Sequence, residues 1–311
     1  MRMRDALTGL VKSLGWEAES DTASGLVSQL SRMVDVSDGQ ISVKEPPTYV
    51  AKIGRVGFPR IGDAIAVAKG RTVRLVADLD EGIYVPSNAR LTLDLNGHTI
   101  TTDGVAIDNL GDVKVSGGTV ESTASFAVCS RSGAKTTLTN LTIRSVEGAV
   151  ITGKAVGTKV MASGCDMYAS DNAVVAGNGS EGFGGNTVVV RNSRLTGGIT
   201  SAGYVACGVY CPNDDSFEID GCDVMVTGGC GVLSRAGRVL VRNTSISTTG
   251  ATTGKVGDSR VVVPCSALVF DEEAAYPSLS DDDSVRAYGC VLASEVDAVA
   301  VIGGGERIEV G

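Results

Sequence analysis

The length and composition describe one large elongated domain with a small appendage. The 311 residues include 41 Gly but only 7 Pro, 5 Phe and 1 Trp, which predicts a narrow core of small side chains. The net charge is −9 and Lys and Arg form no stripe, which excludes the basic surface that a nucleic-acid partner needs. No run reaches the roughly 18 to 20 apolar residues that span a bilayer, so we expect no membrane partner. The N-terminus also lacks the apolar core of a signal peptide, so we expect the protein to begin in a cytoplasm.

Residues 1–48 are expected to form a short helical segment and a linker. Apolar residues recur at helical spacing from Asp5 to Leu14, before Gly15, and again from Gly25 to Val34, and Pro46 and Pro47 then separate them from the rest. Helices this short are marginal alone in water, so their apolar faces must pack on each other, a second copy or another protein. The attachment hypothesis assigns that contact to Leu7, Leu10, Val11, Leu14, Leu26, Leu30 and Met33.

Residues 49–311 are dominated by a repeated motif, apolar-x-(Gly/Asn)-x-x-apolar, first seen as LNGHTI from Leu95. Its Gly or Asn marks a sharp corner with positive φ. These corner residues are Gly97, Gly117, Asn140, Gly164, Asn192, Gly221, Asn243 and Gly289. A second signature, a small residue followed by apolar ones such as AVV at 173, alternates with the first. Each unit of about 22 to 24 residues therefore carries short strands and turns and makes one coil.

Stacked coils predict an all-β fold, a single-stranded parallel β-helix of about eight to ten coils with a short α-helical N-terminal segment. YVAKIG from Tyr49, GDAIAVAKGRTVRLVADL and LTLDLNGHTI closely resemble the opening of pectate-lyase-like β-helix modules of phage and bacterial surface proteins. The resemblance implies a right-handed helix, and it implies that Pro59–Lys69 forms a helix capping its open end. It covers residues 49–311.

The eight Cys are scattered, which favours reduced, buried thiols over a disulfide framework. Cys165, Cys222 and Cys290 follow corner residues and should point into the core, while Cys207 and Cys230 should be stacked neighbours on consecutive coils. Cys207 and Cys211 lack a second matching pair, and the only His, His98, is distant in sequence. We therefore expect no metal and no cofactor.

Candidate functional residues are few. Two positions past the corner, Asp166, Arg194 and Asp223 form an outward column, and Arg191, Asp220 and Arg242 form another one position before it. These columns can stabilise register or bind a glycan. Asp214 and Asp215 echo acidic motifs of polygalacturonase-like enzymes, but the accompanying Gly-His-Gly and Arg-Ile-Lys motifs are missing, so they are weak catalytic candidates.

Four insertions are expected to project from the rod, and the acidic runs 271–273 and 281–283 within them are expected to be solvated. The predicted insertions are Asn178–Asn186, Gly197–Tyr204, Thr249–Arg260 and Asp271–Asp283.

These features lead to a functional expectation with two alternatives. We expect a non-enzymatic phage virion protein, assembled in the host cytoplasm and displayed on head or tail, whose residues 1–48 bind other virion proteins and whose rod can bind host-surface glycan. The alternatives are a polysaccharide-degrading tailspike-type lyase or hydrolase, and a non-catalytic carbohydrate-binding adhesion module. The resemblance to trimeric phage appendages, with no evident cap after AVAVIGG, favours a homotrimer.

Overall fold

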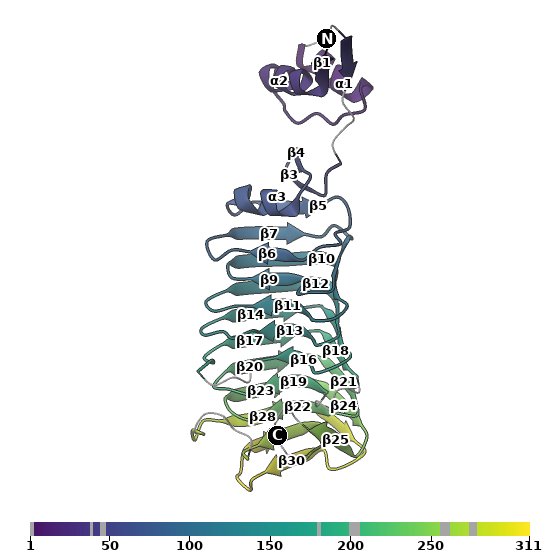
Figure 1. The fold of residues 1–311 in the computed structure, drawn as a ribbon. Helices are drawn as coiled ribbons and strands as arrows, with labels where there is room; N and C mark the ends of the chain where they lie inside the picture. The colour runs from purple at the N-terminus through teal and green to yellow at the C-terminus, as the bar shows by residue number, and fades with distance from the viewer. Residues whose placement is uncertain are drawn as a thin grey trace.

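The chain forms a right-handed parallel β-solenoid of about nine coils in the computed structural model, which confirms the predicted fold class. The structure describes residues 3–37, 40–43, 48–178, 182–198, 206–255, 262–273 and 279–311. Figure 1 shows the coils stacked into a rod, with a small N-terminal unit beyond one end and the C-terminus at the other.

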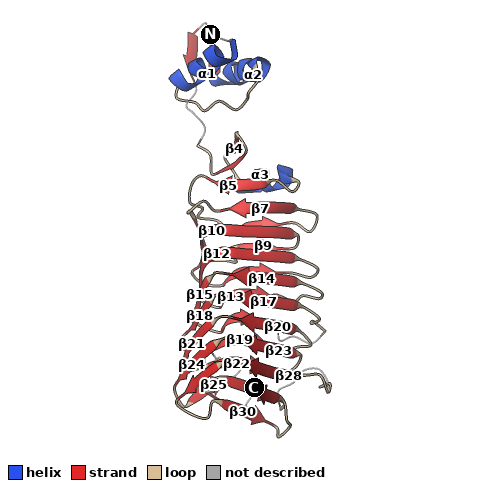
Figure 2. Cartoon of the chain, turned by 180° about the vertical axis from the view of Figure 1, so that it is seen from behind, coloured by secondary structure: helices blue, strands red, loops and turns tan. Residues whose placement is uncertain are grey.

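Three parallel sheets form the walls of the rod (Figure 2). The first sheet contains β5 Thr72–Leu75, β7 Arg90–Asp94, β10 Asp112–Ser122, β12 Lys135–Ser145, β14 Lys159–Ser163, β17 Thr187–Arg191, β20 Ser216–Asp220, β23 Arg238–Arg242, β28 Ser284–Tyr288 and β31 Ile308–Val310. The second sheet contains β8 Thr99–Thr102, the second halves of β10 and β12, β15 Asp166–Ala169, β18 Arg194–Gly197, β21 Asp223–Thr227, β24 Ser245–Thr249 and β29 Val291–Ser294. The third contains β6 Ile83–Val85, β9 Ile107–Asn109, β11 Phe126–Ser130, β13 Gly148–Thr152, β16 Ala173–Ala176, β19 Cys207–Cys211, β22 Cys230–Ser234, β27 Leu268–Asp271 and β30 Val299–Ile302.

The predicted corner residues turn the chain between the first and second sheets. All eight have positive φ, between 48° and 85°, which Gly and Asn tolerate better than other residues. The second signature supplies the strands of the third sheet from β9 to β30. Both sequence signatures therefore correspond to repeated positions of the solenoid, as expected.

The cysteines follow the predicted register. Cys207 and Cys230 are directly paired on β19 and β22, their Sγ atoms lie 3.4 Å apart, and the two side chains remain thiols. Cys165 and Cys222 are buried in the core, and Cys290 is half-buried against it.

Small antiparallel and helical elements close the first coil. The hairpin of β3 Ala51–Ile53 and β4 Val56–Phe58 pairs with β5, and α3 Ile61–Ala68 follows it. Ile61, Ala64, Ile65 and Ala68 of α3 are buried in the main core, which confirms the predicted capping helix. At the opposite end the last coil leaves Val291 67% and Val310 53% exposed.

The N-terminal unit contains the two predicted helices, α1 Met3–Ser13 and α2 Ala23–Met33. The linker prediction is wrong for part of its length, because β1 Val34–Ser37 and β2 Gln40–Val43 form an antiparallel hairpin. Side chains of α1 and α2 pack on each other in a core of Val11, Leu26 and Met33.

Polar contacts join this unit to the start of the rod. The Tyr49 hydroxyl donates to Glu19 at 2.8 Å, and Lys52 forms an ion pair with Glu17. Burial and the Glu19 carboxylate raise the pKa of Tyr49 to about 12.

The insertions are only partly as predicted. The third contains a hairpin of β25 Thr252–Lys255 and β26 Val262–Pro264. The first and fourth insertions are narrower than predicted, because Asn186 is buried and Asp271 is the last residue of strand β27. Residues 179–181, 199–205, 256–261 and 274–278 of these insertions lie outside the described residues.

Candidate functional site

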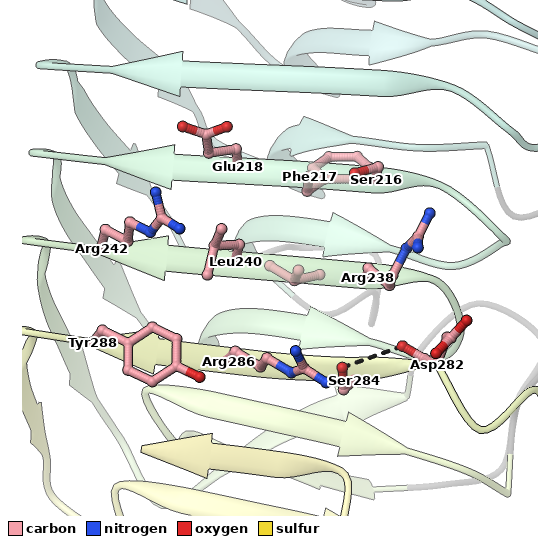
Figure 3. A pocket seen from close by; sticks show the side chains of 11 residues that line it. Ser216, Phe217, Glu218, Arg238, Leu240, Arg242, Asp282, Ser284, Arg286 and Tyr288 are labelled. Carbon is pink, nitrogen blue, oxygen red and sulfur yellow. Dashed lines mark hydrogen bonds between the residues drawn. The ribbon is translucent and has the colours of Figure 1, made fainter. Parts of the chain in front are cut away.

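A shallow groove crosses the first sheet in the C-terminal third of the rod. It has a volume of about 490 Å³ and lies over β20, β23 and β28. Figure 3 shows the side chains that line it. We call it the arginine groove, and its outward-facing lining residues are Ser216, Glu218, Arg238, Leu240, Arg242, Asp282, Ser284, Arg286 and Tyr288.

Strand alternation and parallel register build this groove. In β23 the side chains of Val239 and Val241 are buried, so Arg238, Leu240 and Arg242 share the outer face. The register places Ser216, Glu218 and Asp220 of β20 beside them on one side. Ser284, Arg286 and Tyr288 of β28 lie on the other side. The result is a grid of three strands and three outward positions, centred on Leu240.

The charges of the groove are unevenly neutralised. Glu218 is already bound by Arg191 at 2.9 Å, and Arg286 lies 3.6 Å from Glu309. Within the described residues, Arg238 and Arg242 make no ion pair. Two exposed guanidinium groups therefore flank an apolar side chain.

Tyr288 adds an aromatic side chain at the edge of this grid. A hydrogen bond to Glu309 raises the pKa of its phenol. Guanidinium groups bind planar oxyanions such as carboxylates through two parallel hydrogen bonds, and aromatic and apolar side chains stack on sugar rings or other flat apolar faces. The arrangement can therefore hold an anionic ligand that also has an apolar face.

The weak catalytic candidates do not form a pair. Asp214 is exposed, whereas Asp215 is 2% exposed and its Oδ1 accepts hydrogen bonds from the backbone and side-chain nitrogens of Asn186, both at 2.9 Å. Burial raises the pKa of the Asp215 carboxyl. This carboxyl is a buried part of the coil corner, so the two groups do not face one cleft as glycoside hydrolysis requires.

The predicted glycan-binding column is assembled as expected but lies outside the arginine groove. Asp166, Arg194 and Asp223 are direct neighbours on β15, β18 and β21 of the second sheet. Arg194 Nε lies 3.7 Å from Asp223 Oδ2, and both side chains are more than 40% exposed.

The expectation that the acidic runs are solvated is wrong for two of their members. Asp271 and Asp283 are 0% and 4% exposed. Asp271 lies 3.3 Å from Arg235, whose guanidinium also donates to the Tyr210 hydroxyl at 2.9 Å. Asp283 accepts a hydrogen bond from the Gly237 backbone. These carboxylates therefore fix insertions onto the rod, because buried charges persist only with partners.

Of the seven predicted attachment residues, Val11, Leu26 and Met33 are buried between the two helices and are not open to a partner. Leu7, Leu14 and Leu30 are half-buried around the same core, and Leu10 is 48% exposed.

The described residues contain no group of three or more His, Cys, Asp or Glu side chains placed to hold a metal ion. No helix among them is long and apolar enough to cross a membrane.

Sequence reasoning missed Arg238, Leu240, Arg286 and Tyr288. The signal was the alternation in RVLVR at 238–242 and VRAY at 285–288, which becomes a site only when the register of the two strands is known. Comparisons of the chain with protein-family models, with curated proteins and with solved structures found no match.

Proposed function

We propose that this chain is a non-enzymatic phage virion structural protein, displayed on the head or tail, whose rod binds an acidic glycan of the host surface through the arginine groove. The observation that carries the binding role is the pair Arg238 and Arg242, which flanks Leu240 without an ion pair in the described part of the chain. The support for the virion setting is the resemblance of residues 49–311 to phage and bacterial surface modules.

The division of the chain supports display rather than catalysis. The N-terminal unit has its own small core and joins the capped end of the rod through polar contacts. It can dock the protein to other virion proteins through exposed residues such as Leu10, while the arginine groove lies far along the rod. The weak catalytic pair is divided between a buried and an exposed position.

Binding is tested by titrating the full chain with polygalacturonate and with neutral dextran in a calorimeter. We expect polygalacturonate alone to bind, and Arg238→Ala and Arg242→Ala each to weaken it, because each removes a charge-assisted contact. Arg90→Ala is the matched control, since Arg90 is an exposed arginine of the same sheet that lies outside the groove and pairs with Asp112. Equal loss with the control variant would contradict the site.

Catalysis is tested on the same sample by following the polymer length over time. Unchanged polygalacturonate supports a binding role. Depolymerisation that disappears in Asp214→Asn or Asp215→Asn would instead support the tailspike-type alternative.

A further inference from the structure

The two unpaired arginines of the arginine groove lie on one strand, with an apolar residue between them. Arg238, Leu240 and Arg242 share the outer face of β23, and buried valines alternate with them. A strand rises about 3.3 Å per residue, so the Cα atoms of Arg238 and Arg242 are about 13 Å apart, with Leu240 midway between them. Figure 3 shows these side chains along the strand. The groove therefore offers two positive positions separated by a neutral, apolar one.

Acidic side chains confine the unpaired positive charge to this strand. Glu218 and Asp220 occupy the outer face of β20, directly beside β23. On the other side, Glu309 of β31 lies 3.6 Å from Arg286, and Asp282 borders the groove. An anionic polymer that ran along the rod axis would cross carboxylates on both sides of β23. A polymer that runs parallel to β23 stays over its two arginines, so charge complementarity favours a path across the rod.

Leu240 makes the middle position unfavourable for a carboxylate. A charged group placed over an apolar side chain loses water and gains no hydrogen-bond donor in return, which costs free energy. A neutral sugar can instead pack the apolar face of its ring on the half-buried Leu240 while its hydroxyl groups remain in water. The site should therefore prefer an acidic sugar at each arginine and a neutral sugar between them.

We propose that the arginine groove selects an acidic glycan by the spacing of its charges. The selected glycan lies parallel to β23, and the two carboxylate-bearing sugars that Arg238 and Arg242 bind are separated by a neutral sugar on Leu240. Leu240 is then a specificity-determining residue. This inference rests on the proposed glycan-binding function and adds the class of glycan, in which neutral sugars separate the acidic ones.

Two acidic glycans of different charge spacing test this selection. Hyaluronate alternates a carboxylate-bearing sugar with a neutral one, whereas polygalacturonate carries a carboxylate on every sugar. Oligosaccharides of equal length should be titrated into the full chain at one ionic strength in a calorimeter. The dissociation constant for the hyaluronate oligosaccharide should be roughly tenfold lower, because only polygalacturonate must place a carboxylate over Leu240.

Leu240→Lys provides the decisive comparison. A lysine at this position can pair with a carboxylate, so the variant should bind the polygalacturonate oligosaccharide more tightly and reverse the preference. Val189→Lys is the matched control, because Val189 occupies the same outward column two coils away and does not line the groove. This control adds the same charge to the same sheet and should leave the ratio of the two dissociation constants unchanged.

Ligand length tests the path across the rod. That path engages two acidic sugars, so a hyaluronate oligosaccharide with two acidic sugars should bind about as tightly as a longer one. A continued large gain with length would indicate a path along the rod and would overturn the proposed orientation.

The outcomes separate this inference from the function on which it rests. If neither acidic oligosaccharide binds, both the glycan-binding function and the selection by charge spacing are refuted. If both bind with equal dissociation constants, or if Leu240→Lys leaves their ratio unchanged, the glycan-binding function stands and the selection by charge spacing is overturned.

Discussion

At the scale of single residues, the corner positions show why Asn and Gly alternate. From Asn140 onward the order is Asn, Gly, Asn, Gly, Asn, Gly over successive corners. A Cβ added at Gly164 would lie 2.5 Å from Asn140 Oδ1, and one at Gly221 would lie 2.8 Å from Asn192 Oδ1. An Asn at one corner therefore occupies the space of a side chain at the next, which only Gly leaves free.

The first prediction concerns this contact. Gly164→Ala should destabilise the rod by more than Gly97→Ala, since both residues have positive φ but a Cβ at Gly97 would meet nothing within 4 Å. Backbone strain alone costs about 1 to 2 kcal/mol in either variant. Thermal unfolding checks the difference, which should shrink when Gly164→Ala is made together with Asn140→Gly. Equal losses for the two single variants would show that Asn140 does not restrict Gly164.

The second prediction concerns the pH dependence of stability at Asp215. Burial raises the pKa of this carboxyl above its ordinary value of 3.8, so the folded state disfavours the charged form. Its contribution to stability is therefore complete below pH 3.8 and is lost as the pH rises through the folded-state pKa. The asparagine of Asp215→Asn cannot ionise. The unfolding free energy of this variant should therefore increase relative to that of the wild type as the pH rises from about 4 to 7.

Denaturant unfolding at several pH values measures this gain. Asp214→Asn is the matched control, because that neighbouring carboxyl is exposed. A difference between Asp215→Asn and the wild type that stays constant across the pH range would contradict the assignment.

At the scale of elements, coils of two kinds alternate along the rod. One kind has a Gly corner followed by Cys, and the other an Asn corner followed by Ser or Thr, from Gly164 to Cys290. The Cys165 backbone nitrogen donates to Ser193 Oγ at 3.1 Å, and the Cys222 nitrogen donates to Thr244 Oγ1 at 3.2 Å. The hydroxyl of one coil thus satisfies a buried backbone donor of the coil before it, which fixes the alternation.

The N-terminal unit gives the third prediction. Leu26 is fully buried in the core between α1 and α2, so Leu26→Ala should cost about 2 to 5 kcal/mol and unfold this small unit. Val27→Ala is the matched control, because Val27 is 48% exposed. Far-ultraviolet circular dichroism should show loss of helix while the main thermal transition remains. If Leu26→Ala also removes the main transition, the rod depends on this unit for its fold.

At the scale of the whole molecule, the two ends of the rod differ. The helix α3 covers the first coil with buried Ile61 and Ile65, whereas the last coil leaves Val291, Val299 and Val310 exposed. Exposed strand edges at the end of a sheet favour association unless they are covered.

The fourth prediction is that the chain forms a parallel homotrimer in which three N-terminal units bury residues such as Leu10 together. Light scattering on the purified full chain should give three times 31.7 kDa, and removal of residues 1–48 should weaken assembly without unfolding the rod. Leu10→Glu tests the contact in the full chain, with Lys12→Glu as a control on the same helix. A monomer at micromolar concentration would contradict the trimer.

The sequence by itself determined the solenoid, its corners and the facing of most strands. Gly or Asn recurs once per coil because backbone sterics restrict positive φ, and apolar residues alternate because every second side chain of a strand is buried. Both causes act locally along the chain. For this reason the corner φ values, the capping helix and the pairing of Cys207 with Cys230 agree with the prediction. The sequence also placed Asp166, Arg194 and Asp223 in one outward column, because position relative to the corner determines which side chains face outward.

Only the tertiary structure decided what the insertions and the exposed faces do. Asp271 is buried because Arg235, 36 residues away, supplies its charge partner, and no local pattern records that contact. Val11 and Leu26 pack on each other rather than face a partner, since helical spacing defines an apolar face but not its occupant. The arginine groove arises because β23 and β28 are neighbours although 41 residues of sequence separate their last and first residues, Arg242 and Ser284. Sites built across coils depend on register, which is a property of the stacked structure.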